Sequence, residues 1–322
     1  MGKVVITSAE LAKFETSAAK LRKELLTMPL MSVQDFLKHV SLRPGIRYSE
    51  SVGELTGTME VGPYSKTRID DDDVEITPRT LYTYFGSVVK KFDPNSVYQS
   101  IWGSNITKGE GLKNTDITQQ VLAFLSKKVG DALYFAQWNA KRNPTGDKTV
   151  DLFDGFDTIA EEEIADGKLS VGNGNLYDLD ISTIDKTNAV DTLKDIWRKA
   201  DYHLKRQKCK LFVTPEILDA YNDDYKITTG AIAYNTQFNQ TFVEGSGNMC
   251  EIVAPPNKAG SKFMQLTTKQ NMLVGVNQMT DEETVAVEKH EAFILQFIMT
   301  LFWGCQYESI KKERLLVIGK NA

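Results

Sequence analysis

Cysteine and histidine are scarce in this sequence of 322 residues, which has only three of each. Cys209, Cys250 and Cys305 lie far apart and form no C-x-x-C pair, so the closely spaced ligands of a structural zinc site are missing. An odd number of cysteines without a disulfide framework is typical of proteins made in a reducing compartment. The sequence therefore excludes a disulfide scaffold and gives no support to a zinc site.

Long apolar runs are also missing. The amino terminus, MGKVVITSAELAKFE, lacks the apolar stretch of a signal peptide. The most apolar segment, residues 292–305, is shorter than the roughly 20 residues that a membrane-spanning helix needs, and Gln296 and Thr300 interrupt it. We therefore expect a soluble protein that is made inside the cell and has no membrane partner.

The sequence has no excess of positive charge. It contains 38 lysines and arginines against 43 aspartates and glutamates, which gives a net charge of −5. Because phosphate binding depends on lysine and arginine, this balance excludes a protein that coats DNA, although local basic patches remain open. The hydrophobic content of 41% and the charged content of 25% are those of a globular chain, whose length corresponds to about two domains.

Signatures of catalysis are absent as well. The sequence contains no G-x-S-x-G elbow, no H-E-x-x-H helix and no catalytic cysteine motif. The glycine-rich residues 172–175 lack the lysine and hydroxyl residue of a phosphate-binding loop, and we interpret them as a turn. Glu161, Glu162 and Glu163 point in different directions on one helical turn, which predicts a solvated face. We expect no active site and no cofactor, and interpret Cys209, Cys305, Trp197 and Trp303 as core residues.

An acidic run, Asp70-Asp71-Asp72-Asp73 with nearby Glu75, is the one cluster that invites a metal hypothesis. Carboxylates bind hard cations, but this run lacks the alternating ligands, central glycine and distal glutamate of a calcium loop. Adjacent carboxylates in a polar stretch are more often a solvated, self-repelling tip. We therefore predict no metal site, and a metal-dependent hydrolase remains only a remote alternative.

Apolar periodicity predicts several helices. The first begins near Thr7, which has capping-box spacing to Glu10, and ends at Pro29. A short helix over 33–40, with Ser32 as its cap, is followed by a break at 43–45. The longest helix spans 115–142, about 42 Å at 1.5 Å per residue. Further helices are expected over 94–101, after residues 152–156, over 190–204, and from Thr214-Pro215 onward.

Strands are predicted from β-branched and aromatic residues between turn signals. Residues 46–76 are rich in glycine, serine, threonine and charge, and we interpret them as a long exposed two-stranded excursion. Residues 79–92 then form a strand. Residues 170–181 form a connector, and short strands follow after residue 208. In residues 293–303 every odd position is apolar, which favours a long strand but leaves a helix open, and residues 315–319 make a final strand.

Two motifs carry a resemblance to a known family. The pattern T-x-K-x-N-M-L-x-G from Thr267 to Gly275 is followed by an acidic turn, and L-F-D-G-F from Leu152 to Phe156 follows the longest helix. In these motifs, and in the order of its elements, the chain resembles tailed-phage major capsid proteins of the Hong Kong 97-type fold. The resemblance implies an α+β fold with a long spine helix, peripheral and axial domains, and an extended β-hairpin loop.

The resemblance also implies a division of the chain. Its parts would be an N-terminal arm (1–45), the extended loop (46–85), a peripheral domain with the spine helix (86–205), an axial domain (206–280), and a return to the peripheral domain (281–322). The loop would reach over a neighbouring subunit. Its charged residues are the expected inter-subunit contacts: Lys66, Arg68, Asp70, Asp71, Asp72 and Asp73.

The function that follows is structural. The chain would assemble with itself, as pentamers and hexamers, into an icosahedral shell that encloses phage double-stranded DNA, contacted non-specifically. The shell would be the virion capsid, assembled in the host bacterial cytoplasm with a separate scaffolding protein and a portal. An encapsulin-like protein compartment is the alternative within the same fold. Some capsids of this family are crosslinked by lysine–asparagine bonds. Lys66 and Asn321 superficially suit such a pairing, but no local pattern identifies the glutamate base, so we predict no crosslink.

Overall fold

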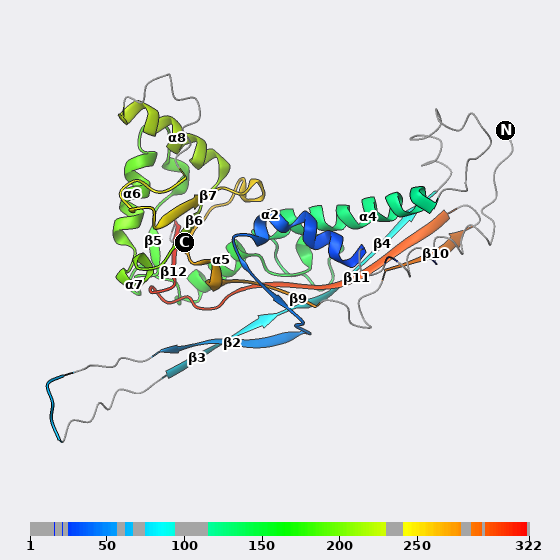
Figure 1. Cartoon of the computed structure of the whole chain (residues 1–322), viewed down its shortest axis with the longest axis horizontal. Coiled ribbons are helices and arrows are strands. Elements are labelled where there is room, and N and C mark those ends of the chain that lie inside the picture. Colours follow the sequence, from blue (N-terminus) through cyan, green and yellow to red (C-terminus); the bar gives the residue numbers. More distant parts are fainter. Residues whose placement is uncertain are drawn as a thin grey trace.

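The fold was analysed in a computed structural model, which describes residues 16, 21, 25–56, 62–66, 75–93, 115–229, 241–277, 285–291 and 294–320. Figure 1 shows a rounded lobe at one end, an elongated platform of helices on strands, and a hairpin that projects away from both. The expected helix over 94–101 lies outside the described residues. Among the described residues, no helix is both long enough and apolar enough to cross a bilayer.

The platform is a five-stranded sheet. Its strands follow the order β1 (Ser41–Pro44), β9 (Met272–Asn277), β11 (Ile294–Tyr307) and β10 (Val285–Glu291), with β4 (Tyr84–Phe92) on the other side of β11. β1 and β9 are parallel, and the remaining pairs are antiparallel. The strand expected in residues 293–303 is confirmed, because β11 pairs with three neighbours. β1 was not predicted: residues 43–44, expected to be a break, add an edge strand to the apolar strand β9.

One face of the platform is covered by helices (Figure 1). α4 (Thr115–Ala136) and the helical residues 25–32 pack on β10 and β11 around Leu122, Leu295 and Phe297. The prediction that Pro29 ends the first helix is wrong, since the helix continues to residue 32. Proline removes one backbone hydrogen bond, but Pro29 packs directly on α4 beside Gly130, and this contact offsets the loss.

Two further helix boundaries differ from the prediction. α2 (Gln34–Leu37) is shorter than 33–40, and Ser32 does not cap it, because the Ser32 hydroxyl donates to the Lys127 carbonyl of α4. α4 ends at Ala136 rather than 142, so it is about 33 Å long. The carbonyls of residues 137, 138 and 140 accept hydrogen bonds from the N–H groups of residues 155–157 instead of continuing the helix.

The lobe holds a second five-stranded sheet. Its order is β5 (Leu176–Asp178), β12 (Leu315–Gly319), β8 (Met264–Thr267), β6 (Cys209–Phe212) and β7 (Cys250–Val253). α6 (Ala189–Lys199), α7 (Tyr202–Lys205) and α8 (Pro215–Thr229) accompany it. The helix predicted over 190–204 is split at Asp201, whose carboxylate accepts the His203 N–H and caps α7. β5 lies in the segment expected to be a connector, since the buried Leu176 pairs with Val317.

The division of the chain implied by the resemblance stays a prediction. Within it, the expected axial segment 206–280 contributes β9 to the platform sheet, and the segment 281–322, expected to return to the peripheral domain, contributes β12 to the sheet of the lobe. α6 also packs in the core of the lobe, around Leu193 and Leu211. A buried apolar strand satisfies either sheet equally well, so its sequence does not reveal which partner it takes.

The remaining elements belong to neither five-stranded sheet. α5 (Phe156–Ala165) confirms the helix expected after residues 152–156. The hairpin strands are β2 (Ser49–Thr56) and β3 (Glu75–Tyr82). The 3-10 helices are Thr149–Asp151, Ile181–Thr183, Pro256–Lys258 and Lys269–Asn271.

Candidate subunit interface: the hairpin and its root

β2 and β3 form a two-stranded antiparallel sheet with eight residue pairs, from Ser49↔Tyr82 to Thr56↔Glu75. This confirms the expected two-stranded excursion. The strand predicted over 79–92 is instead divided at Thr83, where the chain leaves the hairpin and enters the platform as β4. Val52 and Leu81 are buried, and both lie at the root with Ile46 and Leu273. The hairpin is therefore attached to the body at its base.

A pair of glycines lets the root lie directly on the platform. Gly275 of β9 and Gly304 of β11 face each other across the strand pair. A Cβ atom at Gly304 would overlap the Tyr82 carbonyl, and one at Gly275 would lie 2.7 Å from the Thr83 methyl group. Glycine inside a strand often marks a close backbone approach, and here that approach is the crossing of β3 into β4.

Arg79 ties β3 to the rest of the body. Its guanidinium donates to the Glu163 carboxylate of α5 at 2.7 Å, to the Gln306 side-chain oxygen at 2.9 Å and to the Tyr307 carbonyl at 3.1 Å. The Arg79 and Glu163 side chains are each 12% exposed. Charge-assisted bonds of this kind are stronger than neutral ones. The prediction of a solvated face is thus wrong for Glu163, because the hairpin covers it.

Further polar contacts fix the turn into and out of the hairpin. The Thr83 hydroxyl donates to the Ile46 carbonyl, and the Thr83 N–H donates to the Tyr48 carbonyl at 2.8 Å. Tyr48 adopts a positive φ of 61°, which a bulky side chain rarely does. The surrounding contacts therefore hold the backbone at the hairpin root in one geometry.

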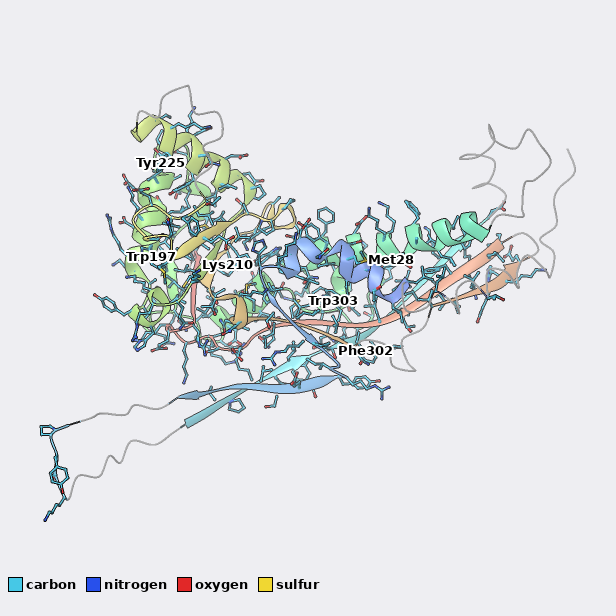
Figure 2. All side chains as sticks on the ribbon, viewed as in Figure 1. Met28, Trp197, Lys210, Tyr225, Phe302 and Trp303 are labelled. Atoms are coloured by element: carbon cyan, nitrogen blue, oxygen red, sulfur yellow. The ribbon has the colours of Figure 1, made fainter. Side chains whose placement is uncertain are left out.

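The platform face opposite α4 carries an exposed apolar surface, which we call the aromatic strip: Tyr48, Phe85, Val89 and Phe302. The first three side chains are 46–58% exposed. Phe302 is buried under Tyr48 and Phe85, with ring centroids 5.3 and 4.9 Å away. Figure 2 shows Phe302 on the hairpin side of β11 and Trp303 on the helix side with Met28. Apolar surface of this kind is typical of interaction sites.

An acidic groove of about 300 Å³ lies beside the root. Asp154, Glu162 and Asp166 line it together with Tyr82 and Tyr84. Partial burial, followed by the repulsion of Asp154, raises the pKa of Glu162 above its ordinary value. No group of three or more histidine, cysteine, aspartate or glutamate side chains in the described part of the chain is arranged to hold a metal ion.

The predicted contact residues are only partly described. Lys66 is exposed and lies in residues 62–66, where Tyr64 is 90% exposed. Figure 1 places this segment at the far end of the projection. Arg68 and the run Asp70–Asp73 lie outside the described residues, as does Asn321. The roles of Arg79, Glu163, Gly275 and Gly304 at the hairpin root were not predicted from the sequence. The two glycines inside apolar strands were the available signal, whereas nothing in the sequence pairs Arg79 with Glu163.

A buried ion pair joins the platform to the lobe. The fully buried Lys258 ammonium lies 3.1 Å from the Asp157 carboxylate and 3.6 Å above the Trp138 ring. Asp157 also accepts hydrogen bonds from Ser261 and Gln265. Burial lowers the pKa of Lys258 to about 8, against the opposing effect of Asp157. Each polar atom of this pair has a partner, as burial of charge requires.

Comparisons with known proteins identify the fold. No family model and no curated protein sequence matches the chain. Solved structures do match. A chain of the satellite phage P4 procapsid matches with a TM-score of 0.53 and 10% identity, over 99% of this chain and 92% of that one. The capsid of a native GTA particle matches at 0.51 and 12%, over 100% and 93%. Mycobacterium phage Adephagia matches at 0.50 and 12%, over 90% of each chain.

These likenesses cover nearly the whole chain and agree with the observed architecture. The chain therefore has the fold of tailed-phage major capsid proteins, the Hong Kong 97-type fold, in an α+β arrangement of a long helix, two sheets and a projecting hairpin.

Proposed function

We propose that this chain is a structural, non-enzymatic shell protein. Copies of it assemble as pentamers and hexamers into an icosahedral capsid around phage double-stranded DNA. The observation that carries this proposal is the hairpin, which projects from the body and buries apolar side chains at its root (Figure 1). A surface segment of this length has a function more often than not, and a projecting strand pair needs a partner surface to become stable.

The capsid fold supports the same function. The similar structures are a phage procapsid, the capsid of a GTA particle and a mycobacteriophage. In a shell of this type the hairpin of one copy would lie over its neighbour, with Lys66, Arg68 and Asp70–Asp73 as charged contacts. The lobe would face the centre of each capsomer and the platform its periphery. A separate scaffolding protein and a portal would take part, and assembly would occur in the host bacterial cytoplasm.

The aromatic strip gives the neighbour a surface to cover. Tyr48, Phe85 and Val89 expose apolar area on the platform face opposite α4. Each contact is small. A closed ring repeats it in every copy, so that weak contacts add through multivalency.

The test is the assembly state of the purified full chain. We expect sedimentation velocity to show rings or larger particles that become closed shells in negative-stain electron microscopy, as protein concentration rises and salt is varied. Virions isolated from the host should contain this chain as the main shell component, with nuclease-protected DNA inside. A chain that stays monomeric at every salt and protein concentration, and is missing from shells made in its host, would contradict the proposal. Shells that hold an enzyme instead of DNA would indicate the encapsulin-like alternative.

A further inference from the structure

Two of the three cysteines face each other across neighbouring strands of the lobe. Cys209 begins β6, Cys250 begins β7, and the two are direct partners in this parallel pair. Their exposed fractions are 1% and 0%, and both side chains contribute to the core that α6 and α8 cover. Cys305 is also buried, but it lies in the platform, where its partner in the neighbouring strand is Val274 rather than Cys209 or Cys250.

The register that opposes the two thiols is fixed by the next residue pair. Lys210 and Glu251 are also direct partners, and their charged atoms meet at 2.5 Å. The Lys210 ammonium also lies 3.0 Å from the His39 ring, and Figure 2 shows Lys210 on the side of the lobe that faces α2. A slip by one residue would separate this ion pair and turn its charges into the core, which is costly.

β7 is held on its other edge as well. The Val243 N–H donates to the Cys250 carbonyl, and the Ile252 N–H donates to the Thr241 carbonyl. β7 is nevertheless the last named strand of its sheet, bordered only by an isolated bridge at Phe242 among the described residues. It is therefore one of the two end strands of this sheet, and end strands open at lower cost than the strands between them.

Neighbouring strands lie about 4.8 Å apart, which is inside the Cα separation of 4.4–6.8 Å that a disulfide spans. We propose that Cys209 and Cys250 are a modification site, which closes to an intramolecular disulfide when the chain meets a low-molecular-weight disulfide such as oxidised glutathione. One protein thiolate attacks the small disulfide and releases one small thiol. The second protein thiolate then displaces the other. Two protein thiols lose two electrons, and the small disulfide gains them with two protons.

Disulfide formation is slow while the lobe is folded and both thiols are buried. Burial raises the pKa of Cys209 to about 12 and that of Cys250 well above its ordinary value, so little thiolate is present at neutral pH. The Cys209 thiol also donates to the Leu204 carbonyl at 2.9 Å. If the proposed function holds, the thiols stay reduced in the host cytoplasm and close after the particle enters an oxidising medium. The bond would then enclose α8 and the whole segment between the two strands.

The experiment uses the isolated full chain, so its result does not depend on shell formation. The protein is incubated with oxidised glutathione at pH 8.5, in urea just below the unfolding transition, and free thiols are then alkylated in denaturant. We expect peptide mass spectrometry to find a Cys209–Cys250 disulfide and to find Cys305 alkylated. The melting temperature should rise by roughly 5–10 °C and return on reduction.

Matched variants sharpen the result. Cys305→Ala should form the same bond with the same shift, whereas Cys250→Ala should show no bond and no shift, and its Cys209 should carry glutathione. In the oxidised wild type, any of three results would overturn the proposal: three alkylated thiols, a glutathione adduct left on Cys209 or Cys250, or a disulfide to Cys305. None of these outcomes bears on whether the chain forms shells.

Discussion

At the scale of single residues, the ion pair between Lys258 and Asp157 makes stability depend on pH. The folded pKa of Lys258, about 8, lies below the ordinary lysine value of 10.5. Below pH 8 the residue is protonated in both states, and the cost of burying an ammonium ion is fully present. Above pH 8 the folded chain releases the proton before the unfolded chain does. Lys258 should therefore add about 1 kcal/mol to the free energy of unfolding between pH 8 and 9, measured as the difference from a variant that lacks both charges.

Urea denaturation at pH 7, 8 and 9 measures this effect. The variant that combines Lys258→Met with Asp157→Asn removes both charges, so it should lack the contribution of Lys258. Burial raises the pKa values of Cys209, Cys250 and Cys305, so both proteins lose stability as the unfolded thiols ionise in the same pH range. This loss cancels in the difference between wild type and variant. Equal slopes in wild type and variant between pH 8 and 9 would show that Lys258 titrates normally.

The hydrogen bonds from Arg79 to Glu163, Gln306 and Tyr307 should contribute to the stability of the single chain, and not only to assembly. Arg79→Met leaves the largely buried Glu163 with Lys168 as its remaining cation, 3.4 Å away. Because the pair is mostly but not fully desolvated, we expect a loss of roughly 2 kcal/mol in the free energy of unfolding. Hydrogen exchange should quicken in β3. Glu163→Gln, which keeps an acceptor, should lose less. No loss in either variant would mean that the other contacts of the root hold it without the Arg79–Glu163 pair.

At the scale of elements, the hairpin divides into a packed root and an outer part. Val52 and Leu81 are buried at the root, whereas residues 63–66 are exposed. Replacing residues 55–76 by Asn-Gly would keep the Glu54↔Thr77 pair and close it with a two-residue turn. We expect calorimetry to show a melting temperature within about 2 °C of the wild type, since the described residues 63–66 are exposed and the buried root is kept. Electron microscopy should show no closed shells.

Val52→Ala is the matched control for that deletion. It removes buried methyl groups at the root, so it should cost roughly 1–3 kcal/mol of stability while leaving the outer hairpin intact. Shells should still form where the variant is folded. A deletion that melts far earlier than the wild type would place the outer hairpin in the core. Normal shells from the deletion variant would remove the bridging role proposed for the hairpin.

The elements also show what the sequence could predict. The hairpin, the long helix, α8 and the strand β11 follow from composition, capping and alternation, which are local signals. The errors at Pro29, Ala136 and Asp201 have tertiary causes: packing on α4, carbonyls bonded to residues 155–157, and a carboxylate that caps a new helix. Each cause lies in a contact between distant segments, which periodicity does not contain.

At the scale of the whole molecule, the sequence also does not reveal which strands pair in which sheet. β9 and β12 are buried at every position, so neither carries a polar face that assigns it to the platform or the lobe. The ion pair between Lys258 and Asp157 could not be predicted either, because 101 positions separate its members. In the sequence Cys209 and Cys250 are two distant cysteines, and only the parallel register of β6 and β7 brings them opposite each other.

The crossing at Gly275 and Gly304 constrains the direction of the hairpin but not its length. At Gly304 main chain lies against main chain, whereas a Cβ atom at Gly275 would meet the side chains of Leu81 and Thr83. These close approaches, together with the hydrogen bonds of Arg79 and Thr83, fix the angle at which β3 leaves the platform. The length of the outer hairpin has no such restriction, since the described residues 63–66 are exposed. Insertions and deletions can therefore change how far the hairpin extends while leaving its direction unaltered.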